Sequence, residues 1–274
     1  MWHRSAEKLT KSELIKGDES AAIARVGKLA QAYWESDSNP NFLKHGPEWV
    51  DDRWSRVLDR PELVHFAWKP EWEKKITREL LLECWENAGD EEGALEAFFL
   101  TMAWGFGANF RGPWKTLEMF KSMRERDFGT YLLGVRAKAR DSNEEAFRSL
   151  LSKRITQLGP VYASKLLYAM SPAGNRSPVM DMWIERWGYR MFELDFRVHS
   201  SSSIDSNVAS LSRFTTFCES ALDAVGKSAP ASRPSSESDV GFIEYLIFWD
   251  AKYKWSRWKR ESEFPTWIQN VNFV

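Results

Sequence analysis

Residues 143 to 183 constrain the fold of this chain more than any other stretch, because they read as two helices, a tight turn between them and a short loop after them. Apolar residues recur at helical spacing on both sides of the turn: Phe147, Leu150, Leu151 and Ile155, then Ala163, Leu166, Leu167 and Met170. Gly159 followed by Pro160 marks the junction, since proline suits the first position of a helix. The stretch therefore predicts a helical hairpin with its turn at Gly159.

Such a turn has a chemical consequence. The first N–H groups of the second helix have no partner within the helix, and the helix dipole makes this end positive, so that a phosphate group can bind without a charged side chain. Lys165 lies one turn further on and can add charge, and Lys153 lies just before the turn. We expect Gly159, Val161, Lys153 and Lys165 to contact phosphate.

This segment resembles the helix-hairpin-helix DNA glycosylases, in particular their 8-oxoguanine glycosylase-like branch. The pattern of that branch is a hairpin of the form L-P-G-V-G, a helix with an alanine, and an apolar loop that ends in an essential aspartate. Here Leu158-Gly159 stands at the V-G end of the hairpin, Ala163 is the helix alanine, and Pro178 to Asp181 is the loop. The resemblance covers about residues 95 to 190.

The resemblance implies an all-α, two-lobed bundle that binds double-stranded DNA. The glycosylase core would span residues 71–274, with the hairpin near 155–166 and the aspartate loop at 177–183. Residues 1–70 would form a helical and irregular segment that packs on this core. The resemblance implies no small-molecule cofactor, although a hairpin of this kind can hold a monovalent cation.

Asp181 is the expected catalytic residue. Breaking an N-glycosidic bond builds positive charge on the sugar, and a nearby carboxylate stabilises that charge and can orient or deprotonate the attacking water. Asp181 precedes the amphipathic run Trp183, Ile184 and Trp187, so it lies near a helix start, where the dipole favours the ionised form. The alternative is that Asp181 only caps this helix, which is the usual role of an aspartate before an apolar run.

Two residues depart from the family pattern. Gln157 stands where the first hairpin glycine would be, and Val161 stands where lyase-competent relatives place their Schiff-base lysine. A valine cannot form an imine, so we expect a monofunctional enzyme without AP-lyase activity. We expect Lys165 to lie on a different face of the helix from Val161 and not to replace the missing lysine.

Residues 102–115 are rich in glycine and aromatic side chains, and the corresponding family loop enters the minor groove and fills the gap left by a flipped nucleotide. By resemblance, the candidates for gap filling and base reading are Trp104, Phe106, Asn109, Phe110 and Arg111. The alternative is a connector whose aromatic residues are core. For the base pocket, we expect Trp183 and, from the C-terminal helix, Trp249.

The composition fits an intracellular globular protein. The chain has 274 residues, 43% of them hydrophobic, and its two cysteines provide neither a disulfide framework nor a metal cluster. Its N-terminus lacks an apolar run, so we expect no secretion signal and no membrane span. The four histidines lie without metal-ligand spacing at His3, His45, His65 and His199. We expect a cytoplasmic, nucleoid-associated prokaryotic monomer.

The distribution of charge matters more than its sum. The net charge of −1 argues weakly against DNA binding, but residues 111–165 hold 12 Lys and Arg against 6 Asp and Glu. A basic middle is what a duplex-binding face needs, although such runs are usually solvated helix faces. The 15 tryptophans are mostly expected in the core, with a minority free to stack on a flipped base.

Helices are expected over several further ranges, from the spacing of apolar residues and the positions of Gly, Pro and capping residues: 19–35, 71–87, 90–103, 113–126, 128–139, 182–190, 206–225 and 241–254. Polar connectors are expected at 199–206 and 226–239.

Three functions are compatible with these features. The first is a glycosylase that removes a damaged or modified base, either oxidised guanine or a bulky modified base of phage DNA, the latter in an antiviral defence role. The second is a noncatalytic helix-hairpin-helix module that binds DNA or scaffolds a repair complex, which Gln157 and Val161 would suit and an intact Asp181 would not. The third is a helical protein-interaction domain without affinity for DNA.

Overall fold

The computed structural model describes residues 17–36, 41–48, 54, 75–107, 109–122, 125–231, 233–255, 264–269 and 271. Within these ranges extended backbone pairs only in an isolated bridge between Glu48 and Lys75, so the predicted all-α fold is confirmed. In chain order the helices are α1 (Glu19–Trp34), the short η1 (Phe42–Lys44), α3 (Arg78–Asn87), α4 (Glu91–Phe106), α5 (Gly112–Lys121), α6 (Glu125–Asp141), α7 (Asn143–Ser152), α8 (Pro160–Met170), α9 (Met182–Phe192), α10 (Ile204–Gly226), the short η4 (Ser235–Ser238), α11 (Val240–Trp255) and α12 (Thr266–Gln269).

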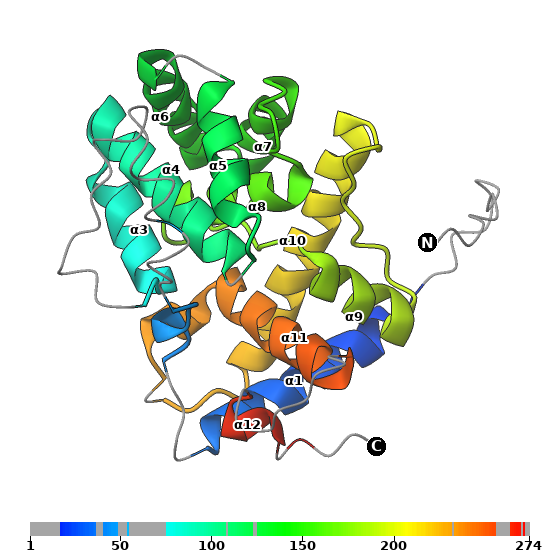
Figure 1. Cartoon of the computed structure of the whole chain (residues 1–274). Coiled ribbons are helices and arrows are strands. Elements are labelled where there is room, and N and C mark those ends of the chain that lie inside the picture. Colours follow the sequence, from blue (N-terminus) through cyan, green and yellow to red (C-terminus); the bar gives the residue numbers. More distant parts are fainter. Residues whose placement is uncertain are drawn as a thin grey trace.

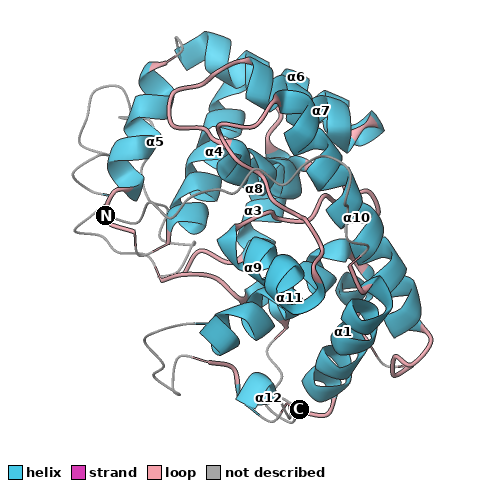
Figure 2. Ribbon diagram, turned by 90° about the vertical axis from the view of Figure 1, so that its right-hand side faces the viewer, coloured by secondary structure: helices cyan, strands magenta, loops and turns pink. Residues whose placement is uncertain are grey.

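The helices pack in two lobes. One lobe holds α3 to α8, and the other holds α1 together with α9 to α12 (Figure 1). The view at right angles separates the same two groups (Figure 2). Contacts between α7 and α10 join the lobes, and the buried Arg78 of α3 pairs with Glu244 of α11 at 2.7 Å. The buried space between the lobes therefore contains charged groups as well as apolar ones.

Helix α1 belongs to the second lobe although it comes first in the chain. Its apolar face, which includes Val26, Leu29 and Tyr33, is fully buried. Arg25 forms a two-point ion pair with Asp250 of α11, with Nη2–Oδ1 at 2.7 Å and Nε–Oδ2 at 3.0 Å. The N-terminal helix is thus fixed to the C-terminal helices by both apolar and ionic contacts.

Helix α8 is the central element of the first lobe, with α3, α4, α6 and α7 packed around it. Its sequence explains this position, because apolar and small residues cover nearly all its faces, and Ala163, Leu166, Leu167 and Tyr168 are fully buried. Any group carried by α8 is therefore held rigidly by its neighbours.

The turn before α8 has the predicted place but an unexpected conformation. Gly159 is the N-cap of α8 with an ordinary φ of −81°, and Pro160 begins the helix as predicted. The left-handed conformation falls instead on Gln157, with φ of 67°, and on Arg154, with φ of 51°. Gln157 occupies the position of the first hairpin glycine in the family pattern, so the turn keeps the glycine-type conformation without the glycine.

Most predicted helices are present, and the differences lie at their ends. The helix expected from residue 71 begins only at Arg78, because Thr77 caps it by accepting a hydrogen bond from Leu80 N at 3.2 Å. Residues 71–74 lie outside the described part of the chain, and Ile76 N bonds to Pro47 O at 3.0 Å instead of joining a helix. The helix expected over 113–126 ends at Lys121.

Candidate active site and DNA-binding surface

A groove of about 450 Å³ lies against the hairpin. It is lined by Gly159, Val161 and Tyr162 of the hairpin, by Lys115 of α5, and by residues 198–200 of the loop between α9 and α10. A Cβ atom added at Gly159 would meet no atom within 4 Å, so the groove is open at the N-terminus of α8. The N–H of Val161 makes no hydrogen bond to any described residue. The groove thus offers a free backbone donor and a lysine to an anion.

Lys115 is a charged residue of this groove that the sequence did not single out. Its Nζ atom lies 5.9 Å from the ring centres of both Phe106 and Tyr162, which themselves pack with ring centres 4.2 Å apart. Lys153, which was expected here, lies instead over the ring of Tyr131 at 5.5 Å and does not line the groove. The charge beside the hairpin therefore comes from α5.

The glycine-rich loop divides its aromatic residues between the core and the surface. Phe106 is only 6% exposed, so it is a core residue in this conformation rather than a protruding wedge. Phe110, at the tip of the loop, is 74% exposed, and the guanidinium of Arg111 lies 5.4 Å from its ring centre. Asn109 is exposed and its Oδ1 accepts from Arg111 N at 3.0 Å, which shapes the tip.

Large apolar side chains are exposed at four places in the described chain: Phe110, Trp114, Met182 and Tyr189. Two of them adjoin residues already named, since Trp114 precedes Lys115 of the hairpin groove and Met182 follows Asp181. Trp114 is 53% exposed and was not a candidate from the sequence. Exposed apolar side chains next to a groove mark an interaction surface more often than scattered ones do.

Asp181 caps α9 with one oxygen and keeps the other free. Its Oδ1 accepts from Trp183 N at 2.8 Å and from Ile184 N at 3.2 Å, whereas Oδ2 makes no hydrogen bond to the described residues. Ser164 of α8 positions the loop, because its hydroxyl donates to Val161 O at 2.8 Å and accepts from Met180 N at 3.0 Å. Both readings of Asp181, cap and reactive group, are thus geometrically compatible.

Lys165 points toward the interior of the molecule rather than toward the hairpin groove. Its Nζ atom donates to Gly105 O at 2.7 Å and lies between two rings, 5.5 Å from the centre of Trp104 and 5.6 Å from that of Tyr162. The expectation that Lys165 and Val161 occupy different faces of the helix is wrong, because residues four apart in a helix share a face. Nζ reaches back over Tyr162 because helical side chains lean toward the N-terminus.

A buried polar cluster, made of Arg78, Lys165, Tyr168, Glu244 and Tyr245, lies between the lobes beside Asp181. Arg78 is 3% exposed, and its guanidinium lies 5.2 Å from the ring centre of Trp104 and 5.0 Å from that of Tyr168. A lone carboxylate, Glu244, stands within the otherwise apolar start of α11, which is a signal that the sequence offered. Nothing in the sequence around Arg78 indicated its role.

Burial perturbs the charged groups of this polar cluster. Burial raises the pKa of Glu244 to about 7, against the attraction of Arg78 and with the help of the negative charge of Asp181. Burial also lowers the pKa of Lys165, and the carboxylates of Asp181 and Glu244 oppose that change. A carboxyl group with a raised pKa close to an amine with a lowered pKa is typical of functional sites.

Several polar atoms near the cluster are buried without a well-aligned hydrogen bond to any described residue: Arg78 Nε and Nη1, Tyr168 Oη, Tyr245 Oη and Trp249 Nε1. The guanidinium of Arg78 nevertheless interacts with the Tyr168 hydroxyl, and the Tyr245 hydroxyl interacts with the indole of Trp249. Trp249 itself is 3% exposed on α11. Buried donors without partners are costly and need an explanation such as water or a ligand. A polar group placed among these atoms could form better-aligned hydrogen bonds than they form with one another.

A comparison with protein-family models decides the family. The model described as "Putative 8-oxoguanine DNA glycosylase OGG-like protein" matches residues 40–248, which is most of the chain. The chain belongs to this OGG-like family. The description of that family implies a DNA glycosylase, which would have DNA as its partner. No curated protein and no solved structure matches the chain.

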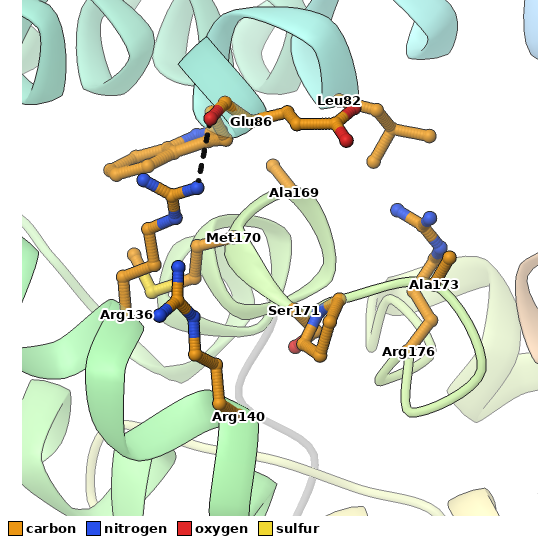
Figure 3. A pocket seen from close by; sticks show the side chains of 11 residues that line it. Leu82, Glu86, Arg136, Arg140, Ala169, Met170, Ser171, Ala173 and Arg176 are labelled. Carbon is orange, nitrogen blue, oxygen red and sulfur yellow. Dashed lines mark hydrogen bonds between the residues drawn. The ribbon is translucent and has the colours of Figure 1, made fainter. Parts of the chain in front are cut away.

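A second cavity in this OGG-like chain, of about 230 Å³, lies at the other end of α8. Figure 3 shows the guanidinium groups of Arg136 and Arg140 on one side and that of Arg176 on the other. Arg136 donates to Ala88 O at 2.7 Å and to Glu86 O at 3.1 Å, so it caps the C-terminus of α3. Arg176 pairs with Asp239 at 2.7 Å. These contacts give Arg136 and Arg176 structural roles, and the cavity is about 16 Å from the hairpin along α8.

Other classes of site are not found in the described part of the OGG-like chain. There, no three His, Cys, Asp or Glu side chains are grouped so that they could hold a metal ion. Of the described helices, none combines the length and the apolar character needed to cross a bilayer.

Proposed function

We propose that the chain is a DNA glycosylase that hydrolyses the N-glycosidic bond of a flipped base, with Asp181 as the catalytic carboxylate. The observation that carries the proposal is the free Oδ2 of Asp181, on a residue otherwise fixed as the cap of α9. That oxygen can stabilise the positive charge that develops on the sugar and can orient a water molecule. The hairpin groove would hold a DNA phosphate while the base enters the interior.

The exposed loop would fill the gap that the flipped base leaves. Phe110 is the best candidate, because its side chain is 74% exposed and Arg111 lies against its ring. An apolar side chain inserted between base pairs substitutes for the lost stacking, and an arginine beside it can read a groove edge. Trp114 supplies a second exposed ring in the first turn of α5, directly after this loop.

The base would be recognised by the buried polar cluster together with Trp104, Trp183 and Trp249. Arg78 offers donors at Nε and Nη1, and Glu244, with its pKa near 7, can accept or donate a hydrogen bond near neutral pH. Such groups suit a base with an altered polar edge, which includes oxidised guanine and a bulky modified base of phage DNA. Repair is the role in the first case and antiviral defence in the second.

The substrate is tested with a panel of purified DNAs: undamaged, chemically oxidised, and phage-derived with modified bases. Abasic sites are counted with an aldehyde-reactive probe. Sites formed only on oxidised DNA would assign repair, and sites formed only on phage DNA would assign defence. Tight binding with no abasic sites formed on any DNA of the panel would favour the noncatalytic module instead.

A second candidate function, an AP-lyase step, is favoured by one observation. Val161 cannot form an imine, yet the amine of Lys165 lies on the same helix face near Asp181, and burial lowers its pKa. That amine could add to the C1′ aldehyde of an abasic sugar and lose water to form an imine. Removal of a C2′ proton would then expel the 3′ phosphate and break the strand.

Borohydride trapping on DNA with a preformed abasic site separates these two candidates. A monofunctional glycosylase gives no covalent adduct, and that is the result the valine at 161 predicts. An adduct that disappears in Lys165→Gln, but persists in the matched surface variant Lys138→Gln, would assign lyase activity to Lys165. Base release from damaged DNA is scored separately, so either result leaves the glycosylase proposal open to its own test.

The remaining properties that we propose are those expected from the sequence: a monomer, cytoplasmic and associated with the nucleoid, without a small-molecule cofactor. A monovalent cation on the carbonyl groups of the hairpin turn also remains a prediction. Size-exclusion chromatography with light scattering tests the first of these, because a dimer would double the measured mass.

A further inference from the structure

A second groove, which we call the α9 groove, follows the outer face of α9. It has a volume of about 420 Å³ and is lined by Met182, Glu185, Arg186, Tyr189, Arg190 and Arg197. The opposite face of α9, with Ile184, Trp187 and Gly188, is buried in the second lobe. Met182 and Tyr189 are each 49% exposed. The outer face therefore combines three arginines with two apolar side chains that the core does not use.

The arginines of the α9 groove are held in place by neighbouring side chains. The guanidinium of Arg197 forms a two-point pair with Asp195, at 2.8 and 3.0 Å, and lies 5.5 Å from the ring centre of Tyr189. Arg186 lies over the ring of Trp183 at 5.1 Å. Neither Arg186 nor Arg190 forms an ion pair with a described residue, so both keep their charge available for a partner.

The α9 groove continues the surface of the hairpin groove. Arg197 lines the α9 groove, and the three residues that follow it, Val198 to Ser200, line the hairpin groove. Consecutive Cα atoms are about 3.8 Å apart, so the two grooves adjoin. The candidate catalytic residue, Asp181, lies at the start of the same helix. A polymer bound at the hairpin thus meets the α9 groove as its next surface.

The length of the groove fits a stretch of nucleic acid backbone. From Met182 to Arg190 the helix rises about 12 Å, at 1.5 Å per residue. One strand of duplex DNA presents a phosphate about every 3.4 Å along the axis, so roughly three phosphates span this distance. Two exposed apolar side chains are too few for the apolar centre of a protein interface, whereas arginines beside an aromatic ring suit phosphate and sugar.

We propose that the α9 groove binds the DNA backbone that continues past the hairpin, through Arg186 and Arg190 with Arg197 beside them. This inference rests on the proposed function, since it extends the DNA contact of the same site. The acidic Glu185 and Asp195 limit the excess of positive charge, which makes this a positioning contact for a flanking segment and not the main source of affinity. The enzyme would then need duplex on that side of the target base.

The test is the salt dependence of duplex binding, measured by fluorescence anisotropy, for the wild type and for Arg186→Ala/Arg190→Ala. The slope of log K against log salt is negative, and each lost phosphate contact makes it shallower by about 0.9. We therefore expect the slope of the double variant to be shallower by about 1.8. The control is Lys75→Ala/Lys227→Ala, which removes two exposed cations that lie outside both grooves and outside the basic stretch 111–165, and it should leave the slope unchanged. Arg186→Lys/Arg190→Lys, which keeps the charges, should retain the slope.

Duplex length gives an independent readout. Shortening the duplex on the α9 side of the target should weaken binding by the wild type but not by the double alanine variant. An unchanged slope and an unchanged length dependence in that variant, with tight wild-type binding, would overturn this inference alone. Failure of the wild type to bind any duplex would overturn the proposed function as well.

Discussion

At the scale of single residues, Asp181 is a helix cap that interacts with buried charged groups from distant parts of the chain. Asp181 lies at the start of α9, as the apolar run after it indicated, and its Oδ1 makes the capping contacts. The buried partners around it could not be read from the sequence. Arg78 and Glu244 are 166 residues apart in the sequence, and only the tertiary structure brings α3 and α11 close enough for them to pair.

Glu244 gives a pH dependence that can be isolated by substitution. Burial raises the pKa of Glu244 to about 7 in the folded state, so folding favours the protonated carboxyl. The contribution of the protonated carboxyl to the free energy of unfolding is complete below about pH 4.5 and is lost as the pH rises to 7. Relative to Glu244→Gln, the wild type should therefore lose stability across this window, by at most about 1.4 kcal/mol per pH unit. Urea unfolding at a series of pH values measures the difference.

His45 has the opposite pH dependence, and for that reason the stability of the wild type is compared with that of Glu244→Gln rather than followed alone. Burial lowers the pKa of His45 to about 3, so its contribution is lost as the pH falls below its ordinary value of 6.5, which is the opposite trend. Both proteins contain His45, and its effect cancels in the comparison. A difference that stays constant from pH 4.5 to 7 would contradict the assignment to Glu244.

At the scale of elements, the sequence predicted the helical hairpin well because its signals are local. Helical spacing and Gly159-Pro160 fix the start of α8, and the structure confirms both. The left-handed conformation at Gln157 could not be predicted, since glutamine has no preference for it and the rest of the turn imposes it. The groove beside the hairpin also depends on Lys115 of α5, which lies some 45 residues away in the sequence.

Gly159→Ala tests the hairpin as a phosphate site. The φ of −81° suits alanine and the added Cβ meets no atom, so we expect the free energy of unfolding to change by less than about 0.5 kcal/mol, as a poorer N-cap and a less flexible unfolded chain offset each other. The Cβ would occupy the groove, and we expect duplex affinity to fall about tenfold, or about 1.4 kcal/mol.

The matched control is Gly134→Ala, on the exposed side of α6, where a Cβ also meets no atom. This variant should gain about 0.5–1 kcal/mol of stability, as alanine is the better helix former, and should keep full affinity. Equal affinity of the Gly159 and Gly134 variants would show that the hairpin does not hold the phosphate.

At the scale of the whole molecule, the fold class and the family could be predicted, whereas the arrangement of the lobes could not. The all-α class followed from apolar periodicity along the chain. The pairing of α1 with α10 and α11 depends on contacts between the two ends of the chain, such as Arg25 with Asp250, which no local pattern signals. Of the segment 1–70, which was expected to pack on the core, the structure describes residues 17–36, 41–48 and 54.

The Arg25–Asp250 pair provides a test of how the chain ends stabilise the second lobe. The Asp250 side chain is fully buried and also accepts from Trp187 Nε1 at 2.9 Å. Arg25→Met would leave that carboxylate without its counter-charge, and we expect a loss of about 3–5 kcal/mol in chemical unfolding. Arg25→Met/Asp250→Asn removes both charges and should recover most of this loss. If it recovers none, packing rather than charge is responsible.

The central claim is that Asp181 performs catalysis in addition to capping α9. Asn caps a helix about as well as Asp, so Asp181→Asn keeps the capping contacts while removing the charge. The decisive measurement is the number of abasic sites that the wild type and Asp181→Asn release from the same damaged or modified DNA, at equal bound protein. We predict that the variant binds DNA normally and releases no base above background. Equal release by the two proteins would contradict the account.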